Sequence, residues 1–365
     1  MHVQVSSAEW VLPGHPDKLC DAAVDAVVDF VRHRDPEGQV GLEAAAMRDT
    51  MVITGRIATY QSVLDELDIP ELVRDVYRSA GYGMDEHGYL WAPDPQQVQV
   101  VTHIQTGEFE EGERENRHLS DDQAVCIGYA NVRIASVPVS VQFVRGIAEK
   151  LVEARKGKGA GLLGPDGKVL ARVEESHPKQ WTPTLCCVSL QHRPDADPLL
   201  LREIVEEAAH WASDRRAVLD LQVNPGGMFV CGGPYGDNGL SGKKLAMDAY
   251  GCSVPIGGGA WSGKDFAKVD RLGGMLARRL ANLAIGQHLG TQAQVTLTYT
   301  PGCDAPVAVD LWLDGKRYEG DALAQLGHPV VDNLSVWREF VTVNHSLVDL
   351  ARWSHWQDYS PWERR

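Results

Sequence analysis

The stretch from Gly232 to Arg271 reads GGPYGDNGLSGKKLAMDAYGCSVPIGGGAWSGKDFAKVDR and decides how the rest of the chain is interpreted. It combines glycine-rich turns with four lysines and four aspartates. Glycine lets the backbone approach a bulky anion closely, lysine supplies mobile positive charge for phosphate, and aspartate can hold the Mg²⁺ that phosphates bring with them. The pattern therefore predicts a binding site for a phosphate chain.

Two glycine-rich turns in this stretch each lead into a pair of lysines, Lys243-Lys244 and Lys264 with Lys268. The second pair is spaced as i, i+4, which predicts a helical turn with both ammonium groups on one face. A solvated surface loop is the alternative interpretation. A Walker A loop is excluded, because Gly236 and Gly242 have five residues between them and Lys243 is followed by a second lysine.

Composition limits the class of protein. The 365 residues suggest two or three domains, and 44% hydrophobic with 23% charged residues is ordinary for a soluble globular protein. A net charge of −15 argues against a general nucleic-acid binder. Seven cysteines without a C-x-x-C pair favour a reducing cytoplasm over a disulfide framework. No membrane span or signal peptide is recognised, so we expect a cytoplasmic protein.

The order of expected elements repeats along the chain. Helices are expected to begin near residues 17, 139 and 267, which are about 120–130 residues apart. Strands are expected at 1–10, 39–46, 51–59, 97–105, 168–175, 184–191, 218–223, 293–300 and 307–313. This order predicts an α+β fold of three similar units, each a mixed sheet with helices on one face. The polar segment 106–121 is expected to be a mobile loop, with a plain solvated insertion as the alternative.

Four stretches together give a specific signal: GHPDK at 14–18, DDQAVCIGYA at 121–130, GGPYGDNGLSGKK at 232–244 and GGGAWSGKDFAKVDR at 257–271. In these stretches the chain resembles the S-adenosylmethionine synthetases (methionine adenosyltransferases), and the resemblance extends to PWE at 361–363. The resemblance implies that methionine sulfur attacks C5′ of ATP and expels the triphosphate, which is then hydrolysed to phosphate and pyrophosphate. A thioether has no proton to lose, so the transfer requires stabilisation of the leaving triphosphate by cations rather than a general base.

The resemblance also implies an architecture. The three units would be interleaved, with residues 1–13 joining 133–231, residues 14–106 joining 232–272, and residues 107–132 joining 273–365. The protein would be a homodimer or a dimer of dimers with its active site between subunits. Its ligands would be ATP and methionine or a related thioether, with Mg²⁺ and K⁺ as cofactors, and neither nucleic acid nor membrane would be a partner.

The resemblance assigns the phosphate end of the site. His15 would lie where the C5′–O bond breaks, although a lone histidine is more often structural. The cations expected on the phosphates are Lys168, Lys243, Lys244, Lys264 and Lys268, and of these Lys168, Lys264 and Lys268 are expected to act in catalysis together with His15. Asp17 and Asp270 would bind Mg²⁺, and Glu43 would place K⁺.

The rest of the expected site surrounds the nucleoside and the thioether. Asp166 would contact the ribose and Phe229 would stack on adenine. Gln105 would contact the substrate carboxylate, and Asp122 and Asp237 would line the methionine and nucleoside end. Glu9 matches an acid that lines the site. A surface carboxylate is the alternative interpretation for Glu9 and Asp166.

The chain departs from the family pattern in several places. The usual GAGDQG is LSDDQA at 119–124, the usual arginine before the adenine-stacking Phe is Met228, and the usual Arg-Lys pair is Lys243-Lys244. The Lys-Lys pair keeps the charge and loses bidentate phosphate geometry. The loop between Gln105 and Asp122 is also about three residues shorter than is usual in the family.

Arg56, in TGRIAT, is the most serious departure, because the family has there a glutamate that binds the methionine ammonium. A charge pair at 4 Å is worth about 4 kcal/mol at an effective dielectric near 20, and Arg56 reverses its sign. Three interpretations remain open. Another acid, such as Asp49, Asp121 or Glu108, takes the ammonium; the thioether is anionic or lacks an amino group; or the transfer is lost and a triphosphate hydrolase or regulatory paralogue remains.

Overall fold

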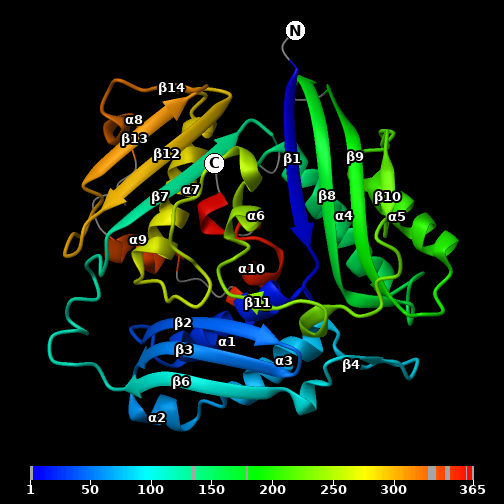
Figure 1. The fold of residues 1–365 in the computed structure, drawn as a ribbon. Coiled ribbons are helices and arrows are strands. Elements are labelled where there is room, and N and C mark those ends of the chain that lie inside the picture. The colour runs from blue at the N-terminus through cyan, green and yellow to red at the C-terminus, as the bar shows by residue number, and fades with distance from the viewer. Residues whose placement is uncertain are drawn as a thin grey trace.

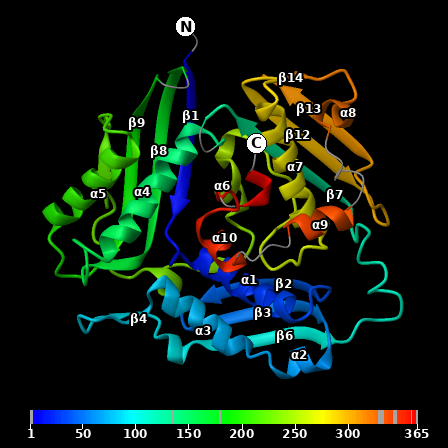
Figure 2. The same ribbon diagram turned by 180° about the vertical axis from the view of Figure 1, so that it is seen from behind.

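The computed structural model describes residues 3–133, 136–177, 180–327, 334–341, 346–358 and 360–363. Figure 1 shows three sheets around the chain's C-terminal segment, and Figure 2 shows them from behind. Each of these sheets has four strands and combines strands from distant parts of the chain. The α+β class expected from the sequence is confirmed.

The β1 sheet has the order β1-β8-β9-β10. Its strands are β1 (Gln4–Val11), β8 (Leu163–His177), β9 (Gln180–His192) and β10 (Leu221–Val223), with β10 parallel to β9 and the other pairs antiparallel. Helices α4 (Val139–Arg155) and α5 (Pro198–Ala212) cover one face, as Figure 2 shows. The first strand of the chain is therefore paired with strands that begin far along the sequence.

The β2 sheet has the order β11-β2-β3-β6. Its strands are β2 (Gln39–Met47), β3 (Thr50–Ala58), β6 (Gln99–Gly107), which is parallel to β3, and β11 (Gly239–Leu240). Helix α1 (Pro16–Arg34) packs on β2, and α3 (Ile69–Ala80) packs on α1. The small elements nearby are α2 (Gln61–Asp65), η1 (Pro95–Gln97) and the two-stranded sheet of β4 (Gly83–Met84) and β5 (Leu90–Trp91).

The β7 sheet has the order β14-β13-β12-β7. Its strands are β7 (Ala124–Asn131), β12 (Gln292–Tyr299), β13 (Ala308–Leu313) and β14 (Lys316–Arg317). Helix α7 (Val269–Gly286) packs on β7 and β12. The remaining elements are α6 (Leu245–Ala249), α8 (Ala322–Leu326), α9 (Leu334–Val341), α10 (Leu347–Trp353), η2 (Gly233–Tyr235), η3 (Gly251–Ser253) and η4 (Pro361–Glu363).

One face of each sheet is covered by helices, and much of the other face is open. The strands lie in front of the helices in Figure 1 and behind them in Figure 2. Side chains alternate between the two faces of a strand, and in β2 the residues Val40, Leu42 and Ala44 are buried against the helix side. Apolar side chains exposed on the open faces include Val5, Leu170, Val52, Val101, Leu240, Val125 and Trp312.

Helix α1 fastens the glycine-rich stretch to the fold through a row of acids that we name the aspartate ladder. Its members, Asp17, Asp21, Asp25 and Asp29, follow one another at four-residue steps and so lie on one face of the helix. Each side chain accepts a backbone N–H from a distant segment through a carboxyl oxygen. The donors are Leu240 (2.8 Å), Gly242 (2.7 Å), Gly263 (2.9 Å) and Leu347 (2.8 Å), in the same order.

Asp25 also forms a buried bidentate ion pair with Arg271. The two guanidinium nitrogens lie 2.8 and 2.9 Å from the two carboxylate oxygens. Both side chains have no exposed surface. The pair therefore joins α1 to the first turn of α7 in a place that water does not reach.

The helical turn expected at residues 264–268 is wrong, because α7 begins only at Val269. The backbone of Lys264 instead forms a bridge with Gly41 of β2. The Asp265 carboxylate accepts the backbone N–H groups of Val40 (2.8 Å) and Ala267 (2.7 Å), and these bonds compete with a helix. The two lysines therefore diverge toward different acids.

Helix α7 continues through Gly273 and Gly274 without interruption. A Cβ at position 274 would lie 2.0 Å from the Trp261 ring, and one at 273 would lie 2.8 Å from Cys126 Sγ. These glycines therefore allow close packing of the helix. No helix in the described residues is long and apolar enough to cross a membrane. The seven cysteines are free thiols.

We predict that Asp25→Asn lowers the free energy of unfolding by about 3–5 kcal/mol at pH 7, because it leaves the Arg271 charge buried without a counter-charge. Urea unfolding followed by circular dichroism measures the change. Asp21→Asn is the matched control on the same helix. Burial raises the pKa of Asp21 to about 8, so the group is already neutral, and an asparagine oxygen can still accept the Gly242 N–H. Similar losses in both variants would contradict the account.

Candidate active site

The open face of β2 connects the two groups of charged residues that the sequence singles out. Gln39, Gly41 and Glu43 follow one another on this face. Glu43 accepts a hydrogen bond from the Ser241 hydroxyl at 2.5 Å. Gly41 bridges Lys264. Strand β2 therefore contacts both the glycine-rich turn next to α1 and the glycine-rich turn that precedes α7.

We name the first group the α1 cluster, centred on His15, Asp17 and Lys244. His15 caps the N-terminus of α1, and its Nδ1 accepts the Asp17 N–H at 3.2 Å. Asp17 is almost fully buried, and its Oδ2 pairs with Lys244 Nζ at 2.7 Å. Lys243 Nζ lies 3.9 Å from the other carboxylate oxygen. Two lysines thus compensate one buried carboxylate.

His15 is held in its neutral form. Burial, together with the charges of Lys244 and Lys168, lowers the pKa of His15 to about 4, against the raising effect of Asp17 and Asp237. Because Nδ1 accepts a hydrogen bond, the proton of the neutral ring is assigned to Nε2. The side chain can therefore donate a hydrogen bond from Nε2 at neutral pH.

Asp166 and Lys168 reach the same region from β8. Asp166 Oδ2 accepts the Gly233 N–H at 2.7 Å, which fixes the first glycine-rich turn. Burial raises the pKa of Asp166 to about 6. Lys168 Nζ pairs with Glu9 Oε2 at 2.5 Å across β1 and β8, so these two expected site residues are neighbours.

The expected nucleoside residues lie near this turn. The Phe229 backbone N–H donates to His192 Nε2 at 3.1 Å, and the phenyl ring is half-buried. The neighbouring residue is Met228, where the family has an arginine. Its side chain is 73% exposed, so it does not take the place of that arginine by packing against the turn. Asp237 is exposed and accepts the Asn238 N–H.

We name the second group the α7 cluster, with Lys264, Lys268 and Asp270. Lys264 Nζ pairs with Asp270 Oδ2 at 2.5 Å. A Cβ at Gly259 would lie 2.1 Å from Asp270 Oδ1, so the GGGAWSG turn lies directly against that carboxylate. Lys268 pairs with Asp121, and a Cβ at Gly41 would lie 3.8 Å from Lys268 Cε, which places the lysine stem over β2.

Residues 108–123, which we name the strap, connect β6 to β7 and lie at the left of Figure 1. Four ion pairs tie the strap to the residues around the β2 sheet. They are Arg56–Glu113, Arg114–Asp35 (2.8 Å), Arg117–Asp265 (2.6 Å) and Lys268–Asp121. The mobility expected for this segment stays a prediction, and its attachments are now defined.

Arg56 meets an acid that the sequence analysis did not name. Its two terminal nitrogens each lie 2.7 Å from one oxygen of Glu113, in a bidentate pair. Arg56 is opposite Gly41 on one side and opposite Gln105, which is exposed, on the other. Asp122 is exposed and accepts the Gln123 N–H. The only indication of Glu113 in the sequence is the high density of glutamates in the strap.

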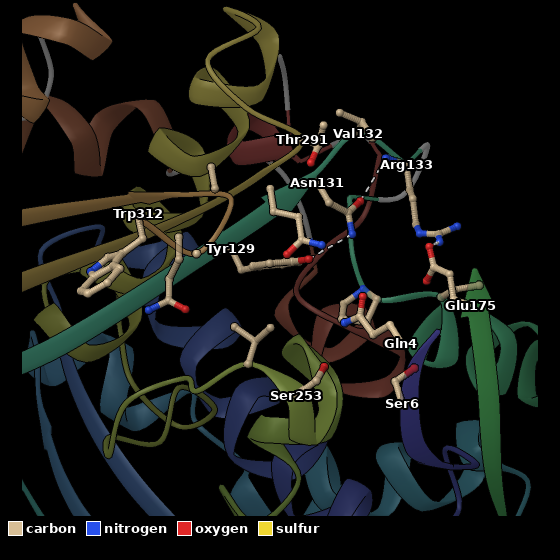
Figure 3. Close-up of a pocket in the computed structure, with 17 residues that line it drawn as sticks. Gln4, Ser6, Tyr129, Asn131, Val132, Arg133, Glu175, Ser253, Thr291 and Trp312 are labelled. Atoms are coloured by element: carbon tan, nitrogen blue, oxygen red, sulfur yellow. Dashed lines mark hydrogen bonds and ion pairs between the residues drawn. The ribbon is translucent and has the colours of Figure 1, made fainter. Parts of the chain in front are cut away.

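Two cavities of the molecule differ in their relation to these groups. Figure 3 shows one of about 380 Å³ between the β1 and β7 sheets, with Tyr129, Asn131 and Trp312 in its wall. None of the expected site residues lines it. The other, of about 510 Å³, lies between the strap, Gln39 and the turn at 301–302. It adjoins the α7 cluster through Asp121 and Ala267.

The donor set suits a magnesium ion that arrives with phosphates. Mg²⁺ is usually bound by one or two carboxylates together with substrate phosphates and water. Asp17 and Asp270 are single carboxylates, each beside a lysine. In the described parts of the chain no three His, Cys, Asp or Glu side chains form a ready-made metal site. Glu43 and Ser241 offer oxygen atoms only.

The lysines, the acids and the glycine-rich turns together form a set of groups suited to an anionic phosphate chain, next to a neutral histidine. Comparison with known proteins makes this assignment specific. The family model described as S-adenosylmethionine synthetase, N-terminal domain, matches residues 4–107, and that of the C-terminal domain matches residues 231–357. The chain belongs to the S-adenosylmethionine synthetase family, which confirms the resemblance seen in the sequence.

Curated relatives agree. S-adenosylmethionine synthase of Methylobacterium nodulans (strain LMG 21967 / CNCM I-2342 / ORS 2060) is 36% identical over 338 residues, covering 88% of this chain and 84% of the relative. The synthase of Methylobacterium sp. (strain 4-46) is 35% identical over 324 residues, covering 85% and 80%. That of Paracoccus denitrificans (strain Pd 1222) is 35% identical over 316 residues, covering 84% and 79%.

We predict that Lys244→Gln raises the pKa of His15 from about 4 toward the ordinary value, because it removes a cation that disfavours the imidazolium and frees the Asp17 charge. NMR titration of the histidine ring, assigned with a His15→Gln variant, measures the midpoint. Lys158→Gln, at an exposed lysine paired with Glu203 and Glu207, is the control and should leave it unchanged. An unchanged or lower midpoint in Lys244→Gln would contradict the assignment.

Proposed function

We propose that this protein transfers the adenosyl group of ATP to methionine sulfur, making S-adenosylmethionine, and then hydrolyses the triphosphate to phosphate and pyrophosphate. The observation that supports this most strongly is the continuity of the α1 and α7 clusters along the open face of β2. Lysines close to both contacts with this strand suit a phosphate chain laid along it. The family membership of the chain gives the reaction class.

The transfer requires little acid–base chemistry. The thioether sulfur forms a bond to C5′ while the C5′–O bond breaks, and both electrons of that bond go to the triphosphate oxygen. Lys243, Lys244, Lys264 and Lys268 would stabilise the charge that builds up there. His15 would donate its Nε2–H to the departing oxygen, and its neutral ring carries that proton on Nε2 because Nδ1 accepts the Asp17 N–H. Lys168 would add a further cation at the same end.

Asp17 and Asp270 would hold Mg²⁺, and Glu43 beside Ser241 would help to place K⁺. When bound, Mg²⁺ neutralises charge on the triphosphate oxygens. Asp166 would contact the ribose, Phe229 would stack on adenine, and Asp237 and Asp122 would line the nucleoside and methionine end. Gln105, on the open face beside Arg56, would contact the substrate carboxylate, and Glu9 would orient Lys168 through their ion pair.

The interleaved units and the oligomer are part of the proposal. The units would be residues 1–13 with 133–231, 14–106 with 232–272, and 107–132 with 273–365. The sheet orders support this division, because β1, β11 and β7 each join strands that are distant in sequence. A homodimer or dimer of dimers would cover the open faces and their exposed apolar side chains, enclosing the site between subunits. The cysteine usage favours the cytoplasm.

Arg56 supports a second candidate function. A cation at this position on the open face would disfavour an ammonium substrate unless an acid compensates it. A different thioether, or triphosphate hydrolysis without transfer, would then remain. Both alternatives keep the lysines of the two clusters. The first differs from the main proposal in the sulfur substrate, and the second lacks the transfer step.

We predict that purified protein with ATP, Mg²⁺, K⁺ and methionine forms a methionine-dependent sulfonium, detected by mass spectrometry together with phosphate and pyrophosphate. Lys264→Ala should lower kcat by about 10²–10³-fold, because it removes a cation from the leaving group. Lys158→Ala, at the exposed surface, is the control and should keep full activity. Cleavage of added tripolyphosphate without any sulfonium would instead support the hydrolase.

A further inference from the structure

The cavity next to the strap has a lining that selects for charge. It is about 510 Å³ in volume and is formed by residues of the strap, β2 and the 301–302 turn. The residues that line it are Gln39, Glu111, Gly112, Glu113, Asn116, Arg117, Leu119, Ser120, Asp121, Ala267, Pro301 and Gly302. Arg56 is not among them, so the Arg56–Glu113 pair presents its acidic member to the cavity.

Glu113 keeps hydrogen-bonding capacity on this side. Its Oε2 accepts from Arg56 and from the Glu110 N–H, whereas Oε1 accepts from Arg56 alone among the described residues. A carboxylate oxygen has two lone-pair directions, so Oε1 can accept one more hydrogen bond. Arg56, with help from the Glu110 N–H, lowers the pKa of Glu113 to about 2. The group is therefore ionised throughout the physiological range.

Gln39 provides a second acceptor. Its Oε1 is shut off from solvent and receives no hydrogen bond within the described parts of the chain. A buried acceptor without a donor is costly, so a ligand donor there would be favourable. Gln39 and Gly41 share one face of β2, and Arg56 is opposite Gly41 in the register, which places Gln39 and the Arg56–Glu113 pair on the same side of the sheet.

The charges around the cavity favour a cation over an anion. Arg117 is paired with Asp265 and Lys268 with Asp121, so both cations are compensated. Glu111 has no ion-pair partner in the part of the chain that the structure describes. A ligand carboxylate could reach Arg56 only by breaking a bidentate pair. An ammonium can reach Glu113 Oε1 without breaking any bond, and it meets Gln39 Oε1 once the Gln39 amide turns toward the cavity.

We propose that this cavity binds the primary ammonium of the amino-acid substrate, with Glu113 as the specificity-determining acceptor, Gln39 as its second acceptor and Arg56 as the residue that positions Glu113. The inference rests on the proposed function. In this inference the substrate ammonium binds to an acid of the strap instead of an acid at position 56 of the sheet. Arg56, which stands where the family has a glutamate, then orients Glu113. The thioether end would extend toward Lys268, whose stem lies over Gly41.

The test compares methionine with its des-amino analogue, 4-(methylsulfanyl)butanoate, on the full-length protein. Calorimetry measures Kd for both ligands, and mass spectrometry measures kcat and KM. We expect the wild type to prefer methionine by about 10–100-fold, the range expected for a charge-assisted hydrogen bond. Glu113→Gln should remove this preference and raise KM for methionine by the same factor, with little change in KM for ATP or in tripolyphosphate cleavage.

Further variants separate the roles. Glu115→Gln, a strap acid outside the cavity lining, is the matched control and should keep the preference. Arg56→Gln should raise KM for methionine with kcat nearly unchanged, and Arg56→Lys should partly restore KM, because it returns the charge without the bidentate geometry. Gln39→Leu should also weaken the preference, and it keeps the test decisive if Glu113→Gln does not fold.

The outcomes distinguish the inference from the proposed function. Preferential binding of methionine that depends on Glu113, without sulfonium formation, would support the inference and refute the proposed function. Sulfonium formation with the preference intact in both Glu113→Gln and Gln39→Leu would refute the inference alone. Preference for the des-amino analogue would also refute it, because the ammonium would then weaken binding instead of strengthening it. Failure to bind either ligand would refute both.

Discussion

The aspartate ladder of α1 is the constraint on which the rest of the site depends. Asp17, Asp21 and Asp25 each accept a backbone N–H from the glycine-rich stretch, although that stretch follows more than two hundred residues later. Three bonds from one rigid helix fix the two glycine-rich turns relative to each other. Because the lysines follow those turns, the ladder also determines where positive charge is presented. The buried Asp25–Arg271 pair extends the attachment into α7.

The open face of β2 lies between the α1 cluster and the α7 cluster, which the aspartate ladder holds in place. Ser241 meets Glu43, and Lys264 meets Gly41, which is the next residue on the same face. The strap is tied to the same region by residues of opposite charge from β3 and from the segments flanking α1 and α7. Arg56 fits this arrangement as one attachment of the strap, through Glu113. A substitution that looks prohibitive when a single position is considered is thus electrically neutral once its partner is included.

Local patterns predicted much of this, and long-range contacts account for the rest. The helix at 139–155 and the strand pair beginning at 39 follow from periodicity alone, and the glycine-rich motifs identified the family. The turn at 264–268 was mispredicted because Asp265 bonds to Val40, a partner invisible to local spacing. The aspartate ladder was visible as four acids at i+4 steps, but its partners were not. Glu113 could not be chosen among the strap glutamates, because only the three-dimensional structure places it against Arg56.

Hydrogen–deuterium exchange with and without ATP, Mg²⁺ and methionine tests most directly whether this face is the reaction surface. The account predicts slower exchange in the turns at 232–244 and 257–264 and in the strap at 108–123, all in the same experiment. Residues 129–133 and 291–294, around the cavity of Figure 3, should exchange at unchanged rates. Protection confined to that cavity, or protection of the turns at 232–244 without those at 257–264, would contradict a single site along β2.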